Sequence, residues 1–246
     1  MTRMSSSLAP PKEFLDKAQE AGIEFEPGDL ERLEGYVAAL IDANQIMNLT
    51  AIREPAEVWQ RHVLESLCLL GHLRALEATS VLDLGSGGGC PGVPLAVAAS
   101  DIQMTLLEAT GKKATFLKGV SQSLPLNNVT VINARAENHG RFDGRAAYDV
   151  VVARAVGPLN VLLELAMPLL RVGGVLVAVK GQRAEQEIAH AKAALQALGS
   201  KVEDTLRMET ATIVSVVKES ATSNLYPRRP GEPKRAPLGG KDKSRS

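Results

Sequence analysis

A glycine-rich turn directly after a short apolar segment is the feature that most constrains the fold of this 246-residue chain. Residues 81–84 read Val-Leu-Asp-Leu, and five glycines follow within the eight residues 85–92. Glycine adopts positive φ without strain and lets a ligand approach the backbone, at an entropic cost that packing alone would not require. A strand followed by such a turn and then a helix is typical of nucleoside-binding sites in doubly wound α/β folds.

A second acidic residue completes this pattern. Asp83 lies in the strand before the turn, and Glu108 ends the next apolar segment, residues 104–107. An acid about 20 residues after the turn places a carboxylate where it can accept hydrogen bonds from ribose hydroxyls. The sequence therefore predicts a nucleoside cofactor bound between the turn and Glu108.

Two cofactors compete for this motif. Dinucleotide enzymes need G-x-G-x-x-G directly after the strand, because the pyrophosphate binds at the N-terminus of the following helix. Counted from Gly85, the pattern meets Cys90 where glycine is required, and counted from Gly87 it begins two residues late. S-adenosyl-L-methionine has no phosphate, and Asp83 would supply an anion for its ammonium group. Bare backbone would come from Gly85, Gly87 and Gly89, so we favour S-adenosyl-L-methionine over a nicotinamide dinucleotide.

The apolar pattern predicts an α/β fold preceded by helices at residues 12–21, 29–47 and 55–70. Near-continuous apolar strands between helices indicate a parallel sheet covered on both faces. The last two strands have no helix between them and must form an antiparallel hairpin. The strands are expected at residues 80–84, 103–108, 129–133, 148–153, 175–180, 201–208 and 212–218, and the helices between them at 91–99, 112–123, 158–170 and 185–198. This is the class I S-adenosylmethionine-dependent methyltransferase fold, a doubly wound, mostly parallel seven-stranded sheet.

Three regions follow from the pattern: an N-terminal helical extension at residues 1–75, a methyltransferase core at 76–220 and a tail at 221–246. The tail is rich in proline and glycine and carries seven Lys and Arg against two Asp and Glu, a net charge of +5 in a chain whose formal net charge is zero. Such a composition predicts a flexible segment that contacts nucleic-acid phosphates. A tail that only aids solubility is the alternative.

Composition also narrows the function classes. Aromatic residues make up 3% of the chain, which argues against RNA-binding modules that stack bases on aromatic platforms. Cys68 and Cys90 stand in separate motifs, so we predict no disulfide framework and no metal site, and expect a reducing, cytoplasmic location. No stretch approaches the ~20 apolar residues of a membrane span, and the N-terminus has no signal-peptide core.

Several short segments, in one order and spacing from about residue 33 to 218, make the chain resemble a known family. They are Asn48 to Arg53, Arg61-His62, Gly85 to Pro94, Leu106 to Glu108 with Gly111-Lys112-Lys113, Arg135 to Glu137, Ala153 to Ala155, and Lys180-Gly181. The chain resembles the bacterial small-subunit ribosomal RNA guanine-N7 methyltransferases, also called the glucose-inhibited division protein B family. Residues 226–231 also resemble the basic ending of many members, whereas Cys90 stands where the family commonly has a bulkier apolar residue.

The resemblance implies roles for particular residues. Gly85 and Cys90 would line the cofactor site, and Glu108 would hold the ribose. Ala136 and Glu137, after the third strand, would lie beside the adenine, with backbone amides as the groups that read it. These positions agree with the rule that ligands bind outside the carboxyl ends of parallel strands.

Arg154, after the fourth strand, would lie where cofactor and substrate meet and orient guanine or a phosphate, since its planar fork suits both. The alternative is an arginine that only pairs with a local carboxylate. Candidates for contact with RNA are Arg61, His62, Lys112, Lys113, Arg228 and Arg229. Packing is the alternative for His62, and a solvated surface is the alternative for the two lysines.

The resemblance implies methylation of ring nitrogen 7 of a guanine in 16S ribosomal RNA, on naked RNA or on the small ribosomal subunit. That nitrogen carries a lone pair and no proton, so no general base is needed. Alternatives are methylation of a small molecule or a different RNA, and an RNA-binding protein without catalysis. A monomer is expected.

Overall fold

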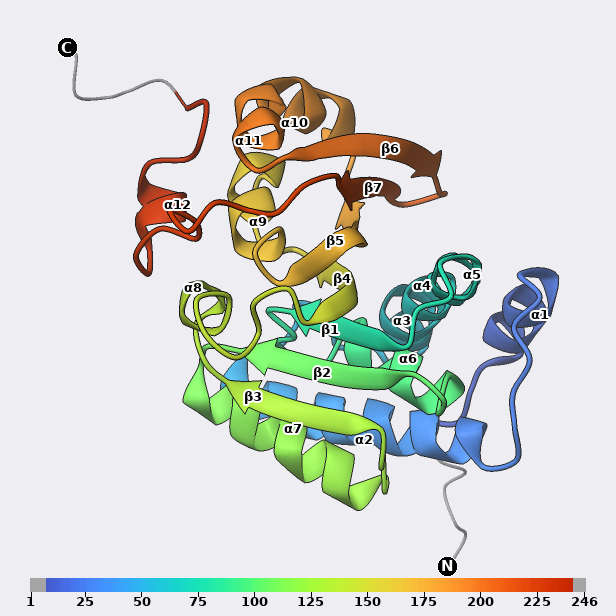
Figure 1. The fold of residues 1–246 in the computed structure, drawn as a ribbon. Helices are drawn as coiled ribbons and strands as arrows, with labels where there is room; N and C mark the ends of the chain where they lie inside the picture. Colours follow the sequence, from blue (N-terminus) through green and yellow to red (C-terminus); the bar gives the residue numbers. More distant parts are fainter. Residues whose placement is uncertain (1–7, 241–246) are drawn as a thin grey trace, which may run out of the picture.

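A single seven-stranded sheet lies between two layers of helices in the computed structural model, which describes residues 8–240 (Figure 1). The strand order is β3-β2-β1-β4-β5-β7-β6. The strands are β1 (Ser80–Leu84), β2 (Gln103–Glu108), β3 (Val129–Asn133), β4 (Tyr148–Arg154), β5 (Leu170–Lys180), β6 (Ser200–Arg207) and β7 (Thr212–Lys218). The first five pair in parallel, and β7 is antiparallel to both β5 and β6. The predicted fold class is thereby confirmed.

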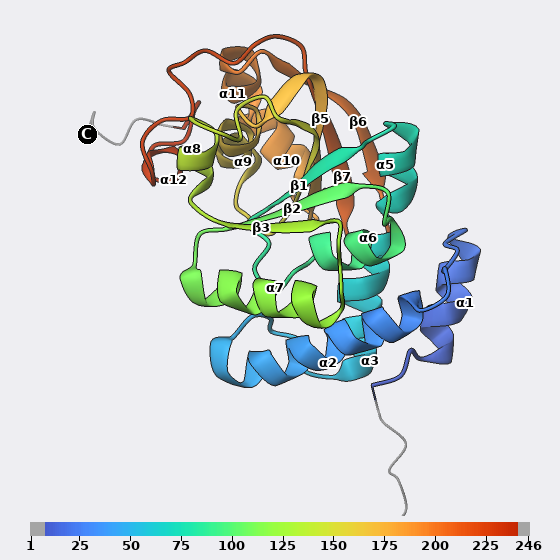
Figure 2. The same cartoon turned by 60° about the horizontal axis from the view of Figure 1, so that its bottom comes forward.

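Alternate residues of the central strands belong to two separate cores. Val81 and Val150 pack in the first core, and Leu82 and Val151 pack in the second, on the opposite face of the sheet. The first face carries α6 (Gly92–Ala98) and α7 (Gly111–Ser123), and the second carries α9 (Leu159–Ala166), α10 (Ala184–His190) and α11 (Lys192–Ala197) (Figures 1 and 2). Burial on both faces explains why the strands are apolar at nearly every position.

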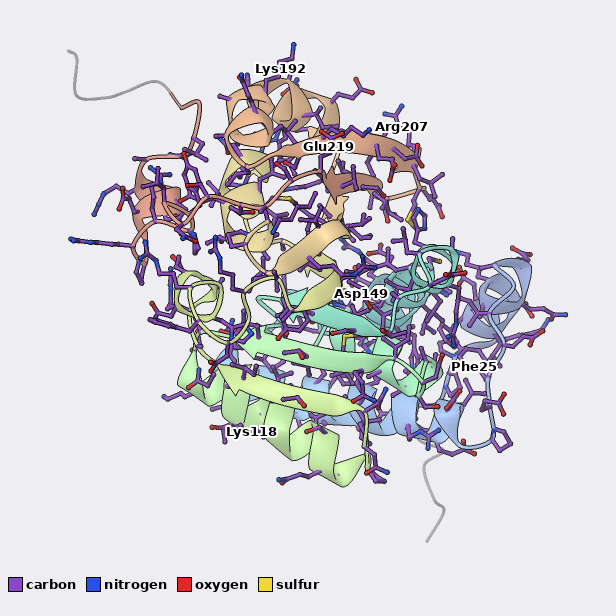
Figure 3. The ribbon with its side chains drawn as sticks, in the orientation of Figure 1. Phe25, Lys118, Asp149, Lys192, Arg207 and Glu219 are labelled. Atoms are coloured by element: carbon purple, nitrogen blue, oxygen red, sulfur yellow. The ribbon has the colours of Figure 1, made fainter. Side chains whose placement is uncertain are left out.

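The N-terminal helices α1 (Lys12–Glu20) and α2 (Asp29–Met47) add to the first core. Helix α2 lies across α6 and α7 on the side away from the sheet (Figure 2). Phe14 of α1 is fully buried, with its ring centroid 4.7 Å from that of Trp59 and 6.1 Å from that of Phe25, which Figure 3 labels. The boundary predicted at residue 75 therefore crosses one continuous core.

Two predicted helices are interrupted and a third ends early. Residues 55–70 form α3 (Pro55–Val58), the π-helical segment η1 (Trp59–Leu64), α4 (Glu65–Leu67) and the start of α5 (Leu70–Ala75). The helix predicted at 185–198 is divided between α10 and α11 at Ala191. Helix α9 ends at Ala166, before Pro168, whose ring disfavours helix continuation, and β5 begins at Leu170. Among the described residues, no helix is long and apolar enough to cross a membrane.

The tail differs from its predicted flexibility, because residues 221–240 pack against the second layer of helices. Arg145 donates to the carbonyl oxygens of Thr222 and Tyr226 at 2.6 and 2.9 Å. The Arg145 guanidinium thus satisfies carbonyl oxygens that lie outside any helix or strand. The part of the predicted tail at residues 241–246 lies outside the described residues.

An ion pair fixes the later part of residues 221–240, which contains the short helix α12 (Glu232–Arg235). Glu164 of α9 is fully buried, and its two oxygens accept bonds from Arg228 at 2.8 and 2.6 Å. The backbone N–H of Arg228 also donates to Glu164, at 2.9 Å. A buried carboxylate needs a cation with several donors, and Arg228 supplies it.

Replacing Phe14 with alanine tests whether α1 shares the main core. We expect Phe14→Ala to lower the free energy of unfolding by about 3 kcal/mol, because it empties a buried site against Trp59. The matched variant Leu15→Ala, at a side chain 37% exposed, should cost about 0.5 kcal/mol or less. Urea unfolding, followed by Trp59 fluorescence and by circular dichroism, measures both. An unchanged dichroism transition in Phe14→Ala would mean that α1 unfolds separately.

Candidate cofactor and substrate site

Two cavities meet at Gly85, at the carboxyl end of β1. The larger, about 480 Å³, is bounded by the glycine loop, by the η1 segment and by Arg154 at the end of β4. The smaller, about 220 Å³, is bounded by residues 134–137, Val156 and Pro233. Strand β1 pairs with both β2 and β4, so the strand order reverses here, and open α/β sheets bind ligands at such a point.

Gly85, Gly87 and Gly88 line the cavities, and the first two have backbone angles that only glycine adopts easily. The φ angles of Gly85 and Gly87 are 74° and 55°, in the left-handed region that side chains rarely adopt. A Cβ at Gly85 would lie 3.3 Å from Val156, in the space between the two cavities. The bare backbone predicted for close approach of a nucleoside is therefore present at this position.

Packing underneath the loop also restricts Gly88, Gly89 and Gly92. A Cβ at Gly88 would come within 2.9 Å of Leu40, and one at Gly92 within 2.3 Å of Leu106. A Cβ at Gly89 would come within 2.8 Å of the side chain of Val93 in α6. Gly89, predicted to face the cofactor, therefore serves the contact between loop and helices.

Asp83 lies beneath the loop and is 1% exposed. Its Oδ2 atom accepts the N–H of Gly92 at 3.0 Å, while Oδ1 has no hydrogen-bond partner within residues 8–240. Burial raises the pKa of Asp83 to about 7, although the bond from Gly92 favours the charged form. The carboxylate anchors the start of α6, and its contact with an ammonium group stays a prediction.

Glu108 fixes the other side of the loop. Its Oε2 accepts the N–H of Gly87 at 2.9 Å, and its Oε1 accepts the N–H of Thr110 at 2.6 Å. Each carboxylate oxygen has a second lone pair, so both can still accept a hydroxyl proton. The residue that the sequence predicts to hold a ribose is therefore also the one that holds the loop in shape.

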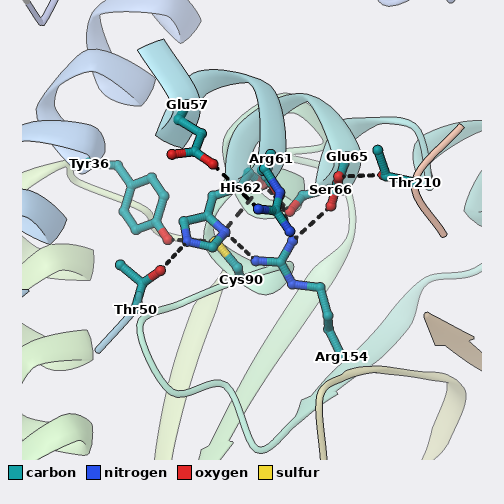
Figure 4. A network of polar contacts seen from close by, with 10 residues as sticks. All are labelled: Tyr36, Thr50, Glu57, Arg61, His62, Glu65, Ser66, Cys90, Arg154 and Thr210. Atoms are coloured by element: carbon teal, nitrogen blue, oxygen red, sulfur yellow. Dashed lines mark hydrogen bonds and ion pairs between the residues drawn. The ribbon is translucent and has the colours of Figure 1, made fainter. Parts of the chain in front are cut away.

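Arg154 is held by a network of polar contacts from the η1 segment (Figure 4). One terminal nitrogen donates to the Arg61 carbonyl at 2.7 Å and to Glu65 at 3.3 Å, and the other donates to Nδ1 of His62. The opposite ring nitrogen of His62 lies 2.7 Å from the hydroxyl of Thr50. Arg154, Arg61 and His62, each predicted separately, thus line one cavity.

His62 is neutral in this network. A guanidinium only donates, so Nδ1 accepts and the ring proton is inferred to lie on Nε2, directed at Thr50. Burial, followed by the charge of Arg154, lowers the pKa of His62 to about 4. Both ring nitrogens are engaged, so His62 orients Arg154 and is not a free base.

Tyr36 and Glu65 are site residues that sequence reasoning missed. The Tyr36 hydroxyl donates to the Gly88 carbonyl at 2.9 Å. It also lies 2.8 Å from the sulfur of Cys90 (Figure 4). Burial raises the pKa of Tyr36 and of Cys90, so both stay protonated. The sequence offered one indication for each residue. Tyr36 carries the lone hydroxyl on the apolar face of the helix at residues 29–47. Glu65 is three residues after His62, so the two share a helix face.

The segment predicted to lie beside adenine lines the smaller cavity. Ala136 and Glu137 begin α8 (Ala136–His139), which follows β3. The carboxylate of Glu137 is buried and accepts bonds from Arg135 at 2.9 Å and from the N–H of Gly231 at 2.7 Å. It is therefore directed at the C-terminal segment.

The remaining RNA candidates lie outside the two cavities. Lys112 and Lys113 begin α7 and line neither cavity. Arg228 is engaged by Glu164, whereas Arg229 is exposed. Within the described residues, no group of three or more His, Cys, Asp or Glu side chains is placed to hold a metal ion.

The ionisation of His62 provides a direct test of the network. Its pKa in the folded protein lies below the ~6.5 of unfolded histidine, so the folded state binds fewer protons. The stability that it contributes is complete above pH ~6.5 and is lost as the pH falls toward 4.

We expect the ring signals of His62, assigned by their absence in His62→Gln, to remain those of a neutral imidazole at pH 5.5 by NMR. Arg154→Met should raise the pKa of His62 but leave it below 6.5, because burial remains. Titration of His62 near pH 6.5 in the unmodified chain would contradict the network.

Comparison with known proteins places the chain in a family. The family model described as GidB, rRNA small subunit methyltransferase G, matches residues 29–214. The ribosomal RNA small subunit methyltransferase G of Sorangium cellulosum is 43% identical over 223 residues, which are 90% of this chain and 93% of the relative. That of Moorella thermoacetica is 37% identical over 228 residues, 90% and 95% of the two chains. The O-methyltransferase of Bacillus cereus in complex with SAH has the same fold, with a TM-score of 0.56 at 17% identity over 82% of this chain and 96% of that one. The chain belongs to the GidB family of rRNA small subunit methyltransferases G.

Proposed function

We propose that the protein transfers a methyl group from S-adenosyl-L-methionine to ring nitrogen 7 of a guanine in 16S ribosomal RNA. Family membership supports the class of reaction and the RNA. The observation that carries the proposal is the meeting of two cavities at Gly85, with Arg154 fixed at the edge of the larger one. The expected cytoplasmic location and monomeric state belong to the same proposal, and size-exclusion chromatography with light scattering tests the latter.

The cofactor fits across Gly85. The smaller cavity has apolar walls from Leu107 and Val156 and suits the adenosine end, and Glu108, which follows Leu107 in the chain, would be the hydroxyl acceptor. The larger, more open cavity takes the methionine end and leaves space for an acceptor base next to Arg154. When bound, S-adenosyl-L-methionine supplies a methyl group on a positively charged sulfur.

The chain's own contribution is alignment. Methyl transfer from a sulfonium is an in-line displacement, which depends on how well acceptor and donor are positioned. Arg154 has the Nε–H and one terminal N–H without a partner in residues 8–240, and its side chain is 18% exposed. Oxygen 6 of guanine accepts hydrogen bonds next to nitrogen 7. Arg154 therefore orients the base through oxygen 6 while nitrogen 7 remains free to react.

No proton needs to be removed from the acceptor. Nitrogen 7 attacks through its lone pair. His62, the nearest imidazole to Arg154, has both nitrogens engaged and a pKa near 4. A site whose histidine is a positioning residue is suited to this acceptor and poorly suited to a hydroxyl or an amine.

Gly85→Asp tests the place of the cofactor. We expect it to abolish binding of S-adenosylhomocysteine, because a charged side chain would fill the junction of the two cavities. Gly119→Asp makes the same change on the exposed side of α7, where a Cβ meets nothing within 4 Å, and should bind normally. Isothermal titration calorimetry measures both. Equal affinity of the Gly85 variant and the unmodified chain would place the cofactor elsewhere.

Arg154→Ala tests the alignment of the base. We expect a fall of about 100-fold in methyl transfer, the order of loss that misplacement of a reactant causes, with cofactor affinity within about threefold. Arg74→Ala, which breaks a surface pair with Asp101 away from the two cavities, should leave transfer unchanged. The assay uses labelled cofactor with small subunits from cells that lack the gene, and mass spectrometry locates the methyl group. Full turnover by Arg154→Ala, or a label on an atom other than guanine nitrogen 7, would contradict the mechanism.

A further inference from the structure

We propose that the C-terminal segment, residues 226–236, is part of the cofactor site, in which Pro233 and Lys234 close the adenosine end. This inference rests on the proposed placement of adenosine in the smaller cavity. It gives a role in cofactor binding to a segment whose sequence suggests a flexible, RNA-binding tail.

The cavity itself includes the segment. Pro233 and Lys234 line it together with Leu107 and Val156, which come from the sheet side. Pro233 is buried although it lies 13 residues from the end of the chain. Helix α12 lies next to α8 in two views (Figures 1 and 2). The core and the C-terminal segment therefore form opposite walls of one slot, the shape that a flat, largely apolar base requires.

One hydrogen bond sets the position of this wall relative to the cavity. Gly231 donates its N–H to the buried carboxylate of Glu137 at 2.7 Å. Gly231 has a φ of 82°, which turns the chain into α12 immediately before Pro233. Glu137 belongs to the adenosine-side segment, so the bond couples the two walls directly.

A second anchor keeps the segment in shape. Arg228 forms the paired contact with buried Glu164 and also donates to the carbonyl of Ala236 at 2.8 Å. This last bond closes residues 228–236 into a loop around Pro233. The wall is therefore built before a ligand arrives, which lowers the entropic cost of binding.

Charge separates this role from RNA binding. Arg228 is neutralised by Glu164, and Lys234 lines the cavity. Arg235, the residue after Lys234, is also exposed but lines neither of the two cavities described. Three further cations follow in the sequence at residues 241–246. Adenosine is uncharged, so its binding depends on contact with the wall and not on the number of cations.

Two shortened chains test the inference. A chain ending at Gly231 keeps the contacts of Arg228 with Glu164 and of Gly231 with Glu137, but lacks Pro233, Lys234 and the Ala236 carbonyl that Arg228 binds. A chain ending at Gly240 keeps the wall and lacks the last three cations. Calorimetry uses 5′-methylthioadenosine and S-adenosylhomocysteine as probes. We expect the chain ending at Gly231 to bind both about tenfold more weakly, or about 1.4 kcal/mol, and the chain ending at Gly240 to match the full chain.

Point variants keep the test valid if the shorter chain fails to fold. Lys234→Ala should weaken both probes about threefold, or about 0.65 kcal/mol, while Arg235→Ala removes the same charge and should have no effect. Thermal melting establishes that each variant is folded. Equal affinities of the Lys234 and Arg235 variants, or loss of S-adenosylhomocysteine affinity alone, would overturn the inference. Unaltered binding by Gly85→Asp would instead overturn the underlying placement of the cofactor.

Discussion

Two carboxylates that accept backbone N–H groups hold the glycine loop, and the remainder of the site depends on them. Asp83 binds the N–H of Gly92 from below, and Glu108 binds that of Gly87 from the side. Glycine-rich backbone loses more conformational freedom on ordering than other backbone, and these two bonds, with the one from Tyr36 to the Gly88 carbonyl, restrain the loop. With both bonds formed, the two cavities have a fixed common boundary and the backbone at Gly85 is presented to them.

The arrangement of strands was predictable for two reasons. Apolar strands alternate regularly with helices, and the last two strands have no helix between them. The packing of residues 221–240 was not, since its partners lie far away in sequence. Arg145 is 77 residues from the carbonyl it binds at Thr222, and Glu164 is 64 residues from Arg228. Composition describes the tail taken alone, but it contains no information about Arg145 and Glu164, which bind the tail from elsewhere in the fold.

The site was predictable where its chemistry is local. Gly85 and Glu108 stand at the ends of consecutive strands, so one motif indicates both. Arg154 was placed by family resemblance and by its position at a strand end, and the structure supplies the contacts that hold it. Tyr36 was missed because a tyrosine on an apolar helix face is usually core, and only the fold brings its hydroxyl to the Gly88 carbonyl. The motif gave no sign that packing beneath the loop also restricts Gly89, whose contact with the cofactor stays a prediction.

The pair formed by Arg228 and Glu164 has a consequence for biosynthesis. Glu164 precedes Arg228 by 64 residues, so during synthesis its carboxylate emerges from the ribosome before its cation. Until Arg228 arrives, water must solvate this charged group on α9. The second layer of helices thus reaches its final packing only once residues 221–236 have joined it.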